Sequence, residues 1–517
     1  MTEQQIRRSQ YIFTYGPGSI IESTKGPRIM LDFDTESKYF NPKSLKEYEK
    51  KDARSKEILA NILGEITPER VRLFTLPTNE AEKLPSAIPL FKTKEFPEWK
   101  ICYNVKKHRE NILYDGKLKN CPKCNKPSDG YTRFIRACSH GHMDDVNWNY
   151  AVHRGKECSS RYFNWVSTGA SLAEIKISCP ICSGETTMGE IYNIKFECTG
   201  RMPESRREYN AKCNSNMIVL QRQSTSLRQP ELITILEIPA KKGESNGEDG
   251  TRNLFHIDEY EYITGVIEDT SEADDNFCKE KTKLFAGNGD IPPLEITQIS
   301  KLKTITIQYG YTRNVKTSDE KRTVIIGKET TDKDGKWFPC FESIGEGLWI
   351  TLPKNMQNLG EKNKSWWNHD ETLESKFGVS NWWNCYNSPI WAWYHTLSHA
   401  LIKSTSLYCG YSIASIRERV YLSRDGKAGA ILLYTSSSGE DGSLGGLSGV
   451  IDFFEEISSA ANEMISICSN DPFCINEIKK QNKPNGSACH SCLMLSETSC
   501  EHGNHFIDRH LIKGSNE

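Results

Sequence analysis

Eighteen cysteines give this chain of 517 residues its most distinctive chemistry. Several fall in Cys-x-x-Cys pairs, and a turn of that length places two sulfur atoms at neighbouring corners of a tetrahedral metal site. In a reducing compartment such pairs act as thiolate ligands and do not form disulfides. The pattern therefore predicts zinc, which thiolates and imidazoles hold in closed, four-coordinate structural sites.

The first predicted zinc site joins a Cys-x-x-Cys pair to a cysteine and a histidine further along the chain. Cys121 and Cys124 form the pair, and Cys138 with His142 completes the four ligands. His140 is an alternative to His142, but its closer spacing to Cys138 gives a tighter geometry.

A catalytic alternative uses the acidic residues that follow the same histidines. A metal-nuclease centre could be formed by His140, His142, Asp144 and Asp145, because carboxylates bind the hard cations that such enzymes use. Two adjacent acidic side chains usually point apart, however, which favours the structural zinc site.

Two more cysteine groups follow, and each predicts a closed structural zinc site. The second site comprises Cys179, Cys182, Cys198 and Cys213. The third comprises Cys474, Cys489, Cys492 and Cys500, with Cys468 as the main alternative to Cys474 and His490 and His502 as weaker ones. Four soft ligands leave no open coordination position for a substrate, so these sites are expected to stabilise the fold. The sequence thus predicts about three zinc ions.

Basic residues collect near the second group. Residues 195–230 carry seven Lys or Arg against three Glu, a net charge of +4, and such a face could bind phosphates. The predicted nucleic-acid contacts are Arg7, Arg8, Arg201, Arg206, Arg207, Lys212, Arg222 and Arg228. A solvated surface without a ligand is the alternative, since few aromatic residues are interleaved.

The last third of the chain offers two other patterns. His395, His399 and Lys403 share one face of a predicted helix over 389–408, but no acidic third ligand is evident, so the histidines are interpreted as structural. The turn from Gly442 to Gly446 lacks the Gly-Lys-Ser/Thr ending of a phosphate-binding loop, which argues against ATP hydrolysis here.

Composition is that of a globular protein with near-neutral charge. Hydrophobic residues make up 37% of the chain and the formal net charge is -2, so a uniformly basic nucleic-acid binder is not expected. The first residues lack the apolar region of a signal peptide, and no apolar run reaches the roughly 18 residues that span a bilayer. We therefore expect a cytoplasmic protein without membrane contact.

The predicted fold is α+β and multi-domain, with zinc-ribbon-like cysteine knots inserted among mixed sheets and helices. Helices are expected over 45–64, 257–275, 389–408 and 449–468. Four regions are expected: an N-terminal region over 1–120, a zinc-bearing region over 121–240, a β-rich middle region with an acidic loop over 241–380, and a C-terminal four-cysteine domain over 381–517.

Several motifs together resemble the DrmB family, an accessory component of the DISARM anti-phage system. The matching pieces include Arg8-Ser-Gln with Tyr15-Gly-Pro-Gly18, the segment from Arg133 to Asp145, and His395-Thr-Leu-Ser-His399. Leu433-Tyr-Thr with Gly442-Ser-Leu-Gly-Gly-Leu447, and the segment from Ala488 to Asn504, match most strongly. They run from end to end of the chain, but 24–115 and 240–295 match poorly, and after Arg201 the expected Pro-Trp is replaced by Met-Pro.

The resemblance implies a non-catalytic subunit that binds a superfamily 2 helicase of the DrmA type and helps the complex engage DNA. It also implies that Cys489, Cys492 and Cys500 are zinc ligands, because the related domain carries a four-cysteine site. A metal-dependent nuclease and a scaffold without DNA contact are the alternatives.

Overall fold

The computed structural model describes residues 6–33, 46, 48–76, 92–128, 130–167, 171–205, 212–238, 254–268, 276–313, 322–329, 335–354, 389–435, 446–477, 485–496 and 499–513. Helices and mixed sheets with several cysteine clusters confirm the predicted α+β class. The chain divides into two compact units, each assembled from three stretches. The first unit is Met1–Lys51, Glu69–Ile233 and Ile307–Phe341, and the second is Asp52–Pro68, Thr234–Thr306 and Glu342–Glu517. The four consecutive regions stay a prediction.

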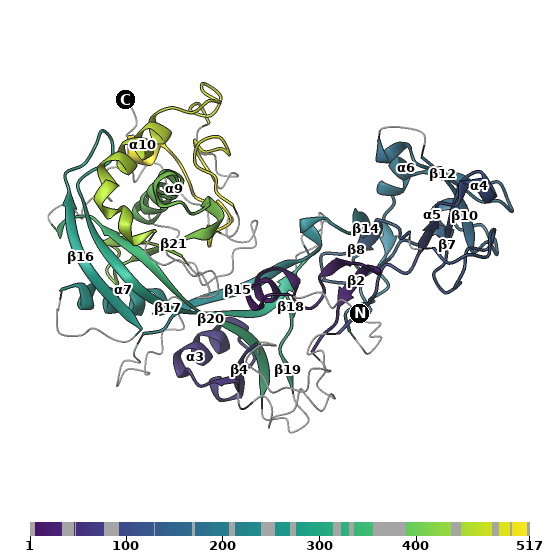
Figure 1. Ribbon diagram of the computed structural model, residues 1–517, viewed down its shortest axis with the longest axis horizontal. Helices are drawn as coiled ribbons and strands as arrows, with labels where there is room; N and C mark the ends of the chain where they lie inside the picture. Colours follow the sequence, from purple (N-terminus) through teal and green to yellow (C-terminus); the bar gives the residue numbers. More distant parts are fainter. Residues whose placement is uncertain are drawn as a thin grey trace. The chain divides into compact units, whose positions relative to one another are not determined.

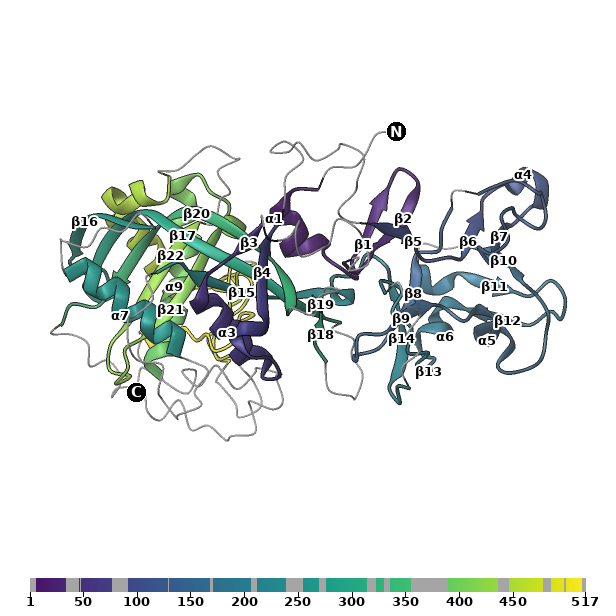
Figure 2. The same ribbon diagram turned by 90° about the horizontal axis from the view of Figure 1, so that it is seen from below.

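The first unit includes three small sheets of short strands, and its residues 307–341 add the end of one longer strand and the start of another. An antiparallel sheet has the order β12 (Glu185–Thr187), β11 (Lys176–Ser178), β10 (Tyr162–Val166), β7 (Asn111–Tyr114) and β6 (Lys100–Cys102), side by side in Figure 2. A second has the order β13 (Phe196–Glu197), β14 (Asn216–Gln221), β8 (Phe134–Ala137) and β9 (Met143–Asp145). A third joins β1 (Ile20–Ser23), β2 (Gly26–Met30) and β5 (Thr93–Glu95).

Short helices and an aromatic core accompany these three sheets. Among the helices are α4 (Val105–His108), α5 (Trp148–His153) and α6 (Met188–Tyr192). Trp148 meets Trp165 edge to face at 5.8 Å between ring centroids, and Phe134 lies 6.1 Å from Trp165. Strands of two to six residues bury little apolar surface by themselves, so cross-links at their ends have a large effect on stability.

The second unit holds longer strand segments between helices, and residues 229–233, 307–312 and 336–341 of the strands named next belong to the first unit. Strands β17 (Leu294–Thr312), β20 (Lys336–Thr351), β22 (Gly429–Thr435) and β21 (Ile416–Leu422) follow one another in the sheet, β15 (Gln229–Leu236) lies beyond β17, and β16 (Phe277–Phe285) also pairs with β17. Side chains alternate between the two faces, as the pleat requires. Leu348, Ile350 and Leu433 pack on one face, whereas Trp349 and Leu432 pack on the other.

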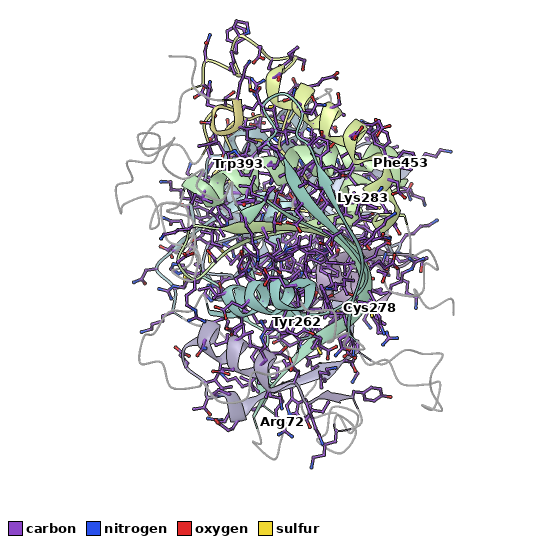
Figure 3. All side chains as sticks on the ribbon, turned by 90° about the vertical axis from the view of Figure 1, so that its left-hand side faces the viewer. Arg72, Tyr262, Cys278, Lys283, Trp393 and Phe453 are labelled. Atoms are coloured by element: carbon purple, nitrogen blue, oxygen red, sulfur yellow. The ribbon has the colours of Figure 1, made fainter. Side chains whose placement is uncertain are left out.

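Helices cover both faces of that sheet. Helix α9 (Pro389–Cys409) packs with α10 (Phe454–Ser466) over the first face, and α7 (Leu254–Glu268) packs against the second (Figure 1). Figure 3 labels Trp393 of α9 and Tyr262 of α7 on opposite sides of the sheet. Along α9, Trp391, Leu397 and Leu401 are fully buried, which explains why its apolar run predicts a helix.

The predicted helices are found with altered ends. The helix predicted over 45–64 starts only at Ala53, because the Asp52 side chain accepts the Ser55 N–H and caps it there, while Glu49–Lys50 forms strand β3. Gly64 ends this helix, α3 (Ala53–Leu63), with a φ of 68°. The helix predicted over 449–468 begins as a 3₁₀ turn at Ser448–Phe453. Among the described helices, none is long and apolar enough to cross a membrane.

Candidate metal centres

Five groups of ligand-type side chains converge within the described residues. In each group the four donor atoms lie within 4.8 Å of one another. Group 1 is Cys102, His108, Cys121 and Cys124; group 2 is Cys138, His142, Cys198 and Cys213; group 3 is His153, Cys158, Cys179 and Cys182. Group 4 is Cys468, Cys474, Cys489 and Cys492; group 5 is His395, Glu418, Cys500 and His502.

The sulfur spacings of groups 1 to 4 fit a tetrahedral zinc ion. With Zn–S bonds of about 2.3 Å, two thiolates at adjacent tetrahedral corners lie about 3.8 Å apart. The observed distances between sulfur atoms are 3.8 Å for Cys102 and Cys124, 3.7 Å for Cys138 and Cys198, 3.7 Å for Cys158 and Cys179, and 3.8 Å for Cys474 and Cys492. Three thiolates and one imidazole, or four thiolates, are donor sets of structural zinc sites.

Group 1 is assembled at the edge of the five-stranded sheet. Cys102 ends β6, and the short helix α4 that follows carries His108, whose Nε2 lies 3.3 Å from the Cys102 sulfur. After β7 the chain turns at Cys121 and Cys124, where Asn125 donates its N–H to the Cys121 carbonyl with a φ of 53°. The two strand ends thus bring the four ligands together.

Group 2 uses the hairpin between β8 and β9. Cys138 follows β8, and Gly141, with a φ of 90°, lets the chain reverse within four residues so that His142 Nδ1 lies 3.5 Å from the Cys138 sulfur. Cys198 follows β13 and its sulfur lies 3.4 Å from the same nitrogen. His140 also approaches this group, with Nδ1 3.3 Å from the Cys213 sulfur.

Group 3 lies where a helix end meets a hairpin. His153 ends α5, and Cys179 and Cys182 occupy the turn between β11 and β12. The turn closes through the Cys179 N–H, which donates to the Gly184 carbonyl at 2.7 Å, and Ser183 takes a φ of 58°. Cys158 approaches from the segment between α5 and β10.

Group 4 lies beyond α10 in the second unit. Cys468 follows the helix, and its sulfur lies 3.4 Å from that of Cys489. The Asp471 carboxylate accepts the N–H groups of Cys468 and Ile475 and pairs with Arg509 at 2.7 Å, which fixes the turn carrying Cys474. Cys489 and Cys492 form the second half, with sulfur atoms 3.7 Å apart.

Local hydrogen bonds lower the pKa of one cysteine in each of groups 2, 3 and 4 and so favour its thiolate form. A hydrogen bond from the Cys198 thiol holds the pKa of Cys138 down at about 4. Burial opposes the ionisation of Cys179, but nearby donors, led by the Cys182 N–H, outweigh it and lower its pKa to about 6. For Cys489 the same balance of burial against donors led by the Cys492 N–H gives a pKa of about 6. Metal ligation requires the thiolate form.

The structure corrects how the predicted ligands were grouped. Each of the twelve predicted ligands lies in one of the five groups, but Cys121 and Cys124 are separated from Cys138 and His142, and Cys179 and Cys182 are separated from Cys198 and Cys213. Cys500 lies in group 5 and not with Cys489 and Cys492, while Cys468 and Cys474 both join group 4. Strand pairing brings together residues far apart in sequence, which nearest-neighbour spacing could not reveal.

The missed ligand candidates had only weak sequence signals. They are Cys102, His108, His153, Cys158 and Glu418, while His395 was interpreted as structural and Cys468 and His502 were considered but not chosen. Cys102 and Cys158 stand outside any Cys-x-x-Cys pair, so only an unpaired cysteine near a histidine could have suggested them.

Asp144 and Asp145, the acidic residues of the nuclease alternative, both accept hydrogen bonds from neighbouring groups of the protein. Asp144 accepts hydrogen bonds from Arg136, Arg201 and Thr199. Asp145 is buried and accepts the Glu98 N–H at 3.0 Å, and burial raises its pKa to about 7. Carboxylates engaged in this way do not present the open, hard oxygen ligands that a nuclease metal needs.

The expectation that no acidic residue lies near His395 and His399 is wrong. Glu418 of β21 lies 2.8 Å from His395 Nε2 and 3.1 Å from His399 Nε2, and all three side chains are fully buried. The predicted glycine turn starting at Gly442 lies largely outside the described residues, with only Gly446 and Leu447 described.

Most of the described arginines of the predicted basic face are engaged inside the first unit. Arg201 pairs with Asp144 and Glu98, and Arg222 pairs with Glu22 at 2.7 Å. Arg228 is half-buried and donates to the carbonyls of Thr14 and Pro17, so the Gly-Pro-Gly turn binds a cation through its Pro17 carbonyl. Lys212 is exposed, Arg7 and Arg8 lie at the described N-terminal end, and Arg206 and Arg207 lie outside the described residues.

Thiolate-rich groups with closed ligand sets are typical of zinc-knot proteins, and one of two matching family models names zinc. A family model described as MrfA Zn-binding domain matches residues 397–493, which contain all of group 4. A family model described as a domain of unknown function, DUF8724, matches residues 7–228, which contain groups 1 to 3.

The predicted resemblance to the DrmB family is confirmed. The chain is 28% identical over 533 aligned positions to the DISARM protein DrmB of Bacillus paralicheniformis, which covers 84% of this chain and 90% of the relative. A solved structure titled as the DUF1998 helicase MrfA bound to DNA aligns with 66% of this chain at 12% identity and a TM-score of 0.26. This chain spans only 37% of the length of that structure.

Proposed function

We propose that this protein is a non-catalytic, zinc-binding subunit of a cytoplasmic anti-phage defence complex, and that it binds a superfamily 2 helicase and helps it engage DNA. The observation that carries the proposal is the similarity to the DISARM protein DrmB along most of both chains. Groups 1 to 4 support the non-catalytic part, because each supplies four protein ligands and leaves no position for a substrate.

A basic surface around group 1 supports the DNA-binding part. Residues 102–126 carry seven Lys or Arg against Glu110 and Asp115, a net charge of +5. Lys106, Lys107 and Arg109 are exposed, and Tyr103 beside them is 57% exposed. Flexible cations next to an exposed aromatic ring are the features that bind phosphates and stack on bases. We call residues 102–126 the group 1 surface and assign the phosphate contacts to it.

Charge reversal at this surface tests the DNA contact. Lys106→Glu with Lys107→Glu should weaken DNA binding by the purified complex. If both lysines contact phosphates, the slope of log K against log salt should become shallower by roughly 2, since each contact contributes about 0.9 for duplex DNA. Binding is measured by fluorescence anisotropy with single-stranded and duplex DNA between low and physiological salt.

A matched control carries the same charge change elsewhere. Arg424 and Lys427 are exposed in the turn between β21 and β22 of the second unit. Arg424→Glu with Lys427→Glu should leave the DNA affinity and its salt slope close to wild type. Equal effects of the two double variants would refute a specific contact at the group 1 surface and leave only net charge as the cause.

Association with a helicase is tested independently of DNA. The full chain, co-expressed with the superfamily 2 helicase encoded beside it, should co-purify through affinity and size-exclusion steps. The pair should bind DNA more tightly than the helicase alone. No association, or association without a gain in DNA affinity, contradicts the proposed role. Metal-dependent cleavage of DNA by the purified chain, lost in Asp145→Ala, would instead establish the nuclease alternative.

A further inference from the structure

Group 5 differs from the other four groups in its ligands and its position. It combines an imidazole from α9, a carboxylate from β21, and a thiol and an imidazole from the turn at Cys500–His502. His395 and Glu418 are fully buried, and Cys500 and His502 are 4% and 8% exposed. Three separate chain segments therefore direct nitrogen, oxygen and sulfur donors to one point inside the second unit.

The Cys500 sulfur has the backbone environment of a metal-bound thiolate. It accepts the N–H of His502 at 3.3 Å and the N–H of Asn504 at 3.4 Å. The same hydrogen bond from the second following residue occurs at Cys179, Cys198 and Cys468, one in each of groups 3, 2 and 4. Amide donors aimed at sulfur stabilise negative charge on it. Cys500 thus shares a local geometry with the thiolates of the zinc-like groups.

A thiolate at Cys500 would lie close to the carboxylate of Glu418. Its sulfur lies 3.3 Å from His395 Nε2, and that nitrogen lies 2.8 Å from Glu418. A buried thiolate and a buried carboxylate around shared imidazoles are strongly unfavourable unless a cation lies among them.

A neighbouring histidine is oriented as if to support such a cation. His399 Nδ1 lies 2.8 Å from the Leu493 carbonyl, which can only accept, so Nδ1 carries the proton. In the neutral ring, Nε2 then presents a lone pair 3.1 Å from His395 Nε2 and 3.1 Å from Glu418. In this tautomer His399 donates no hydrogen bond to Glu418, so it does not offset the charge of the carboxylate in place of a cation.

From this convergence we propose that His395, Glu418, Cys500 and His502 form a fifth metal site, separate from the four-cysteine site of the same unit. Two imidazoles, one thiolate and one carboxylate suit a borderline divalent ion of the zinc class. All four positions are taken by protein and the site is closed to solvent, so the ion is structural. It fastens the turn at Cys500–His502 to α9 and β21.

The competing arrangement contains no metal. In it, His399 is an imidazolium and His395 a neutral imidazole, and both donate to the same oxygen of Glu418. Ser398 donates to the other oxygen, and Cys500 remains a neutral thiol. This core is electrically neutral and hydrogen-bonded. The two arrangements differ in metal content and not in fold, which makes a count of ions decisive.

The test counts ions on the intact chain. Native mass spectrometry resolves the number of zinc ions per folded chain, and elemental analysis gives the total. Wild type should hold five ions. Cys500→Ser and Glu418→Gln, which keeps the acceptor for Ser398, should each hold one fewer, and Cys409→Ser should hold the wild-type number because Cys409 lies outside all five groups.

Two outcomes overturn the proposal. One is a wild-type chain that saturates at four ions, a measurement that does not depend on the folding of any variant. The other is an unchanged ion count in Cys500→Ser or Glu418→Gln. Because no helicase or DNA is involved, the result is independent of the proposed function in phage defence.

Discussion

Arg313 holds the turn of group 2 from inside the first unit, and its removal should loosen that metal centre. The guanidinium is fully buried and donates to three acceptors: Nε to the Gly141 carbonyl at 2.9 Å, Nη1 to the Leu227 carbonyl at 2.7 Å and Nη2 to Glu204 at 3.1 Å. Gly141 lies between Cys138 and His142. The arginine therefore anchors the backbone of the turn that presents two candidate ligands.

The cost of Arg313→Met follows from these partners. Breaking a buried ion pair costs about 3–5 kcal/mol, because the remaining charge is left without compensation. Glu204 would keep its hydrogen bond from Tyr311, while the carbonyls of Gly141 and Leu227 would each lose a donor at roughly 1–3 kcal/mol. These terms overlap, so we expect a total near 5 kcal/mol, comparable with the whole stability of a marginal domain.

Hydrogen exchange resolved by peptide measures this effect in the first unit alone. Arg313→Met should reduce the protection of β8 and β9 and lower the zinc affinity of group 2, while peptides of β21 and β22 keep wild-type exchange. Adding Glu204→Gln should recover part of the loss by removing the uncompensated charge. Arg424→Met is the control, since the pair of Arg424 with Glu261 is exposed and contributes below about 1 kcal/mol. Wild-type protection of β8 and β9 in Arg313→Met would refute the reasoning.

Three more changes test other parts of the structure. Cys179→Ser should remove one zinc ion, whereas Cys340→Ser, at a buried cysteine outside the groups, should remove none, as elemental analysis can check. Leu397→Ala in the buried face of α9 should lower the free energy of unfolding of the second unit by about 2–5 kcal/mol, measured in urea. Leu407 is 69% exposed, so the control Leu407→Ala should lower it by less than about 0.5 kcal/mol. The hydrogen bond that His510 Nδ1 donates to the Asp508 carboxylate raises the pKa of His510 above its usual 6.5, so its stabilisation is complete below pH 6.5 and is lost as the pH rises through the raised pKa. His510→Asn should therefore flatten thermal stability against pH in that window.

Sequence patterns predict local features of this protein well, because those features depend on neighbouring residues. The apolar run after Pro389 predicts α9, and the Cys-x-x-Cys pairs at Cys121 and Cys179 predict turns that present two sulfur atoms together. Glycine at position 141 allows the tight reversal that brings Cys138 to His142. In each of these cases the residues that decide the structure lie within a few positions of one another.

The partners of those turns could not be predicted in the same way, because they depend on strand order. Cys102 lies near Cys121 because β6 pairs with β7. Cys138 lies near Cys198 because β14 pairs with both β8 and β13, the strands that these two cysteines follow. Neither pairing leaves a signature in the spacing of the cysteines. Glu418 is the clearest case. It lies 19 residues from His399, on a strand whose sequence gives no sign of a metal ligand, and only the packing of α9 on β21 brings the two side chains together.

The distribution of the groups suggests why the two units need metal to different degrees. The first unit holds groups 1 to 3 at the ends of strands of two to six residues, where metal cross-links replace part of the missing apolar core. The second unit holds residues 294–306 of β17 and 342–351 of β20, longer strand segments with helices on both faces of their sheet, and its two groups lie around the turns that follow α10 and approach α9. Graded chelation should therefore unfold the first unit before the sheet of the second. A basic surface built on group 1 would then be lost early, so DNA binding by the complex should fail at chelator concentrations that leave α9 and its sheet intact.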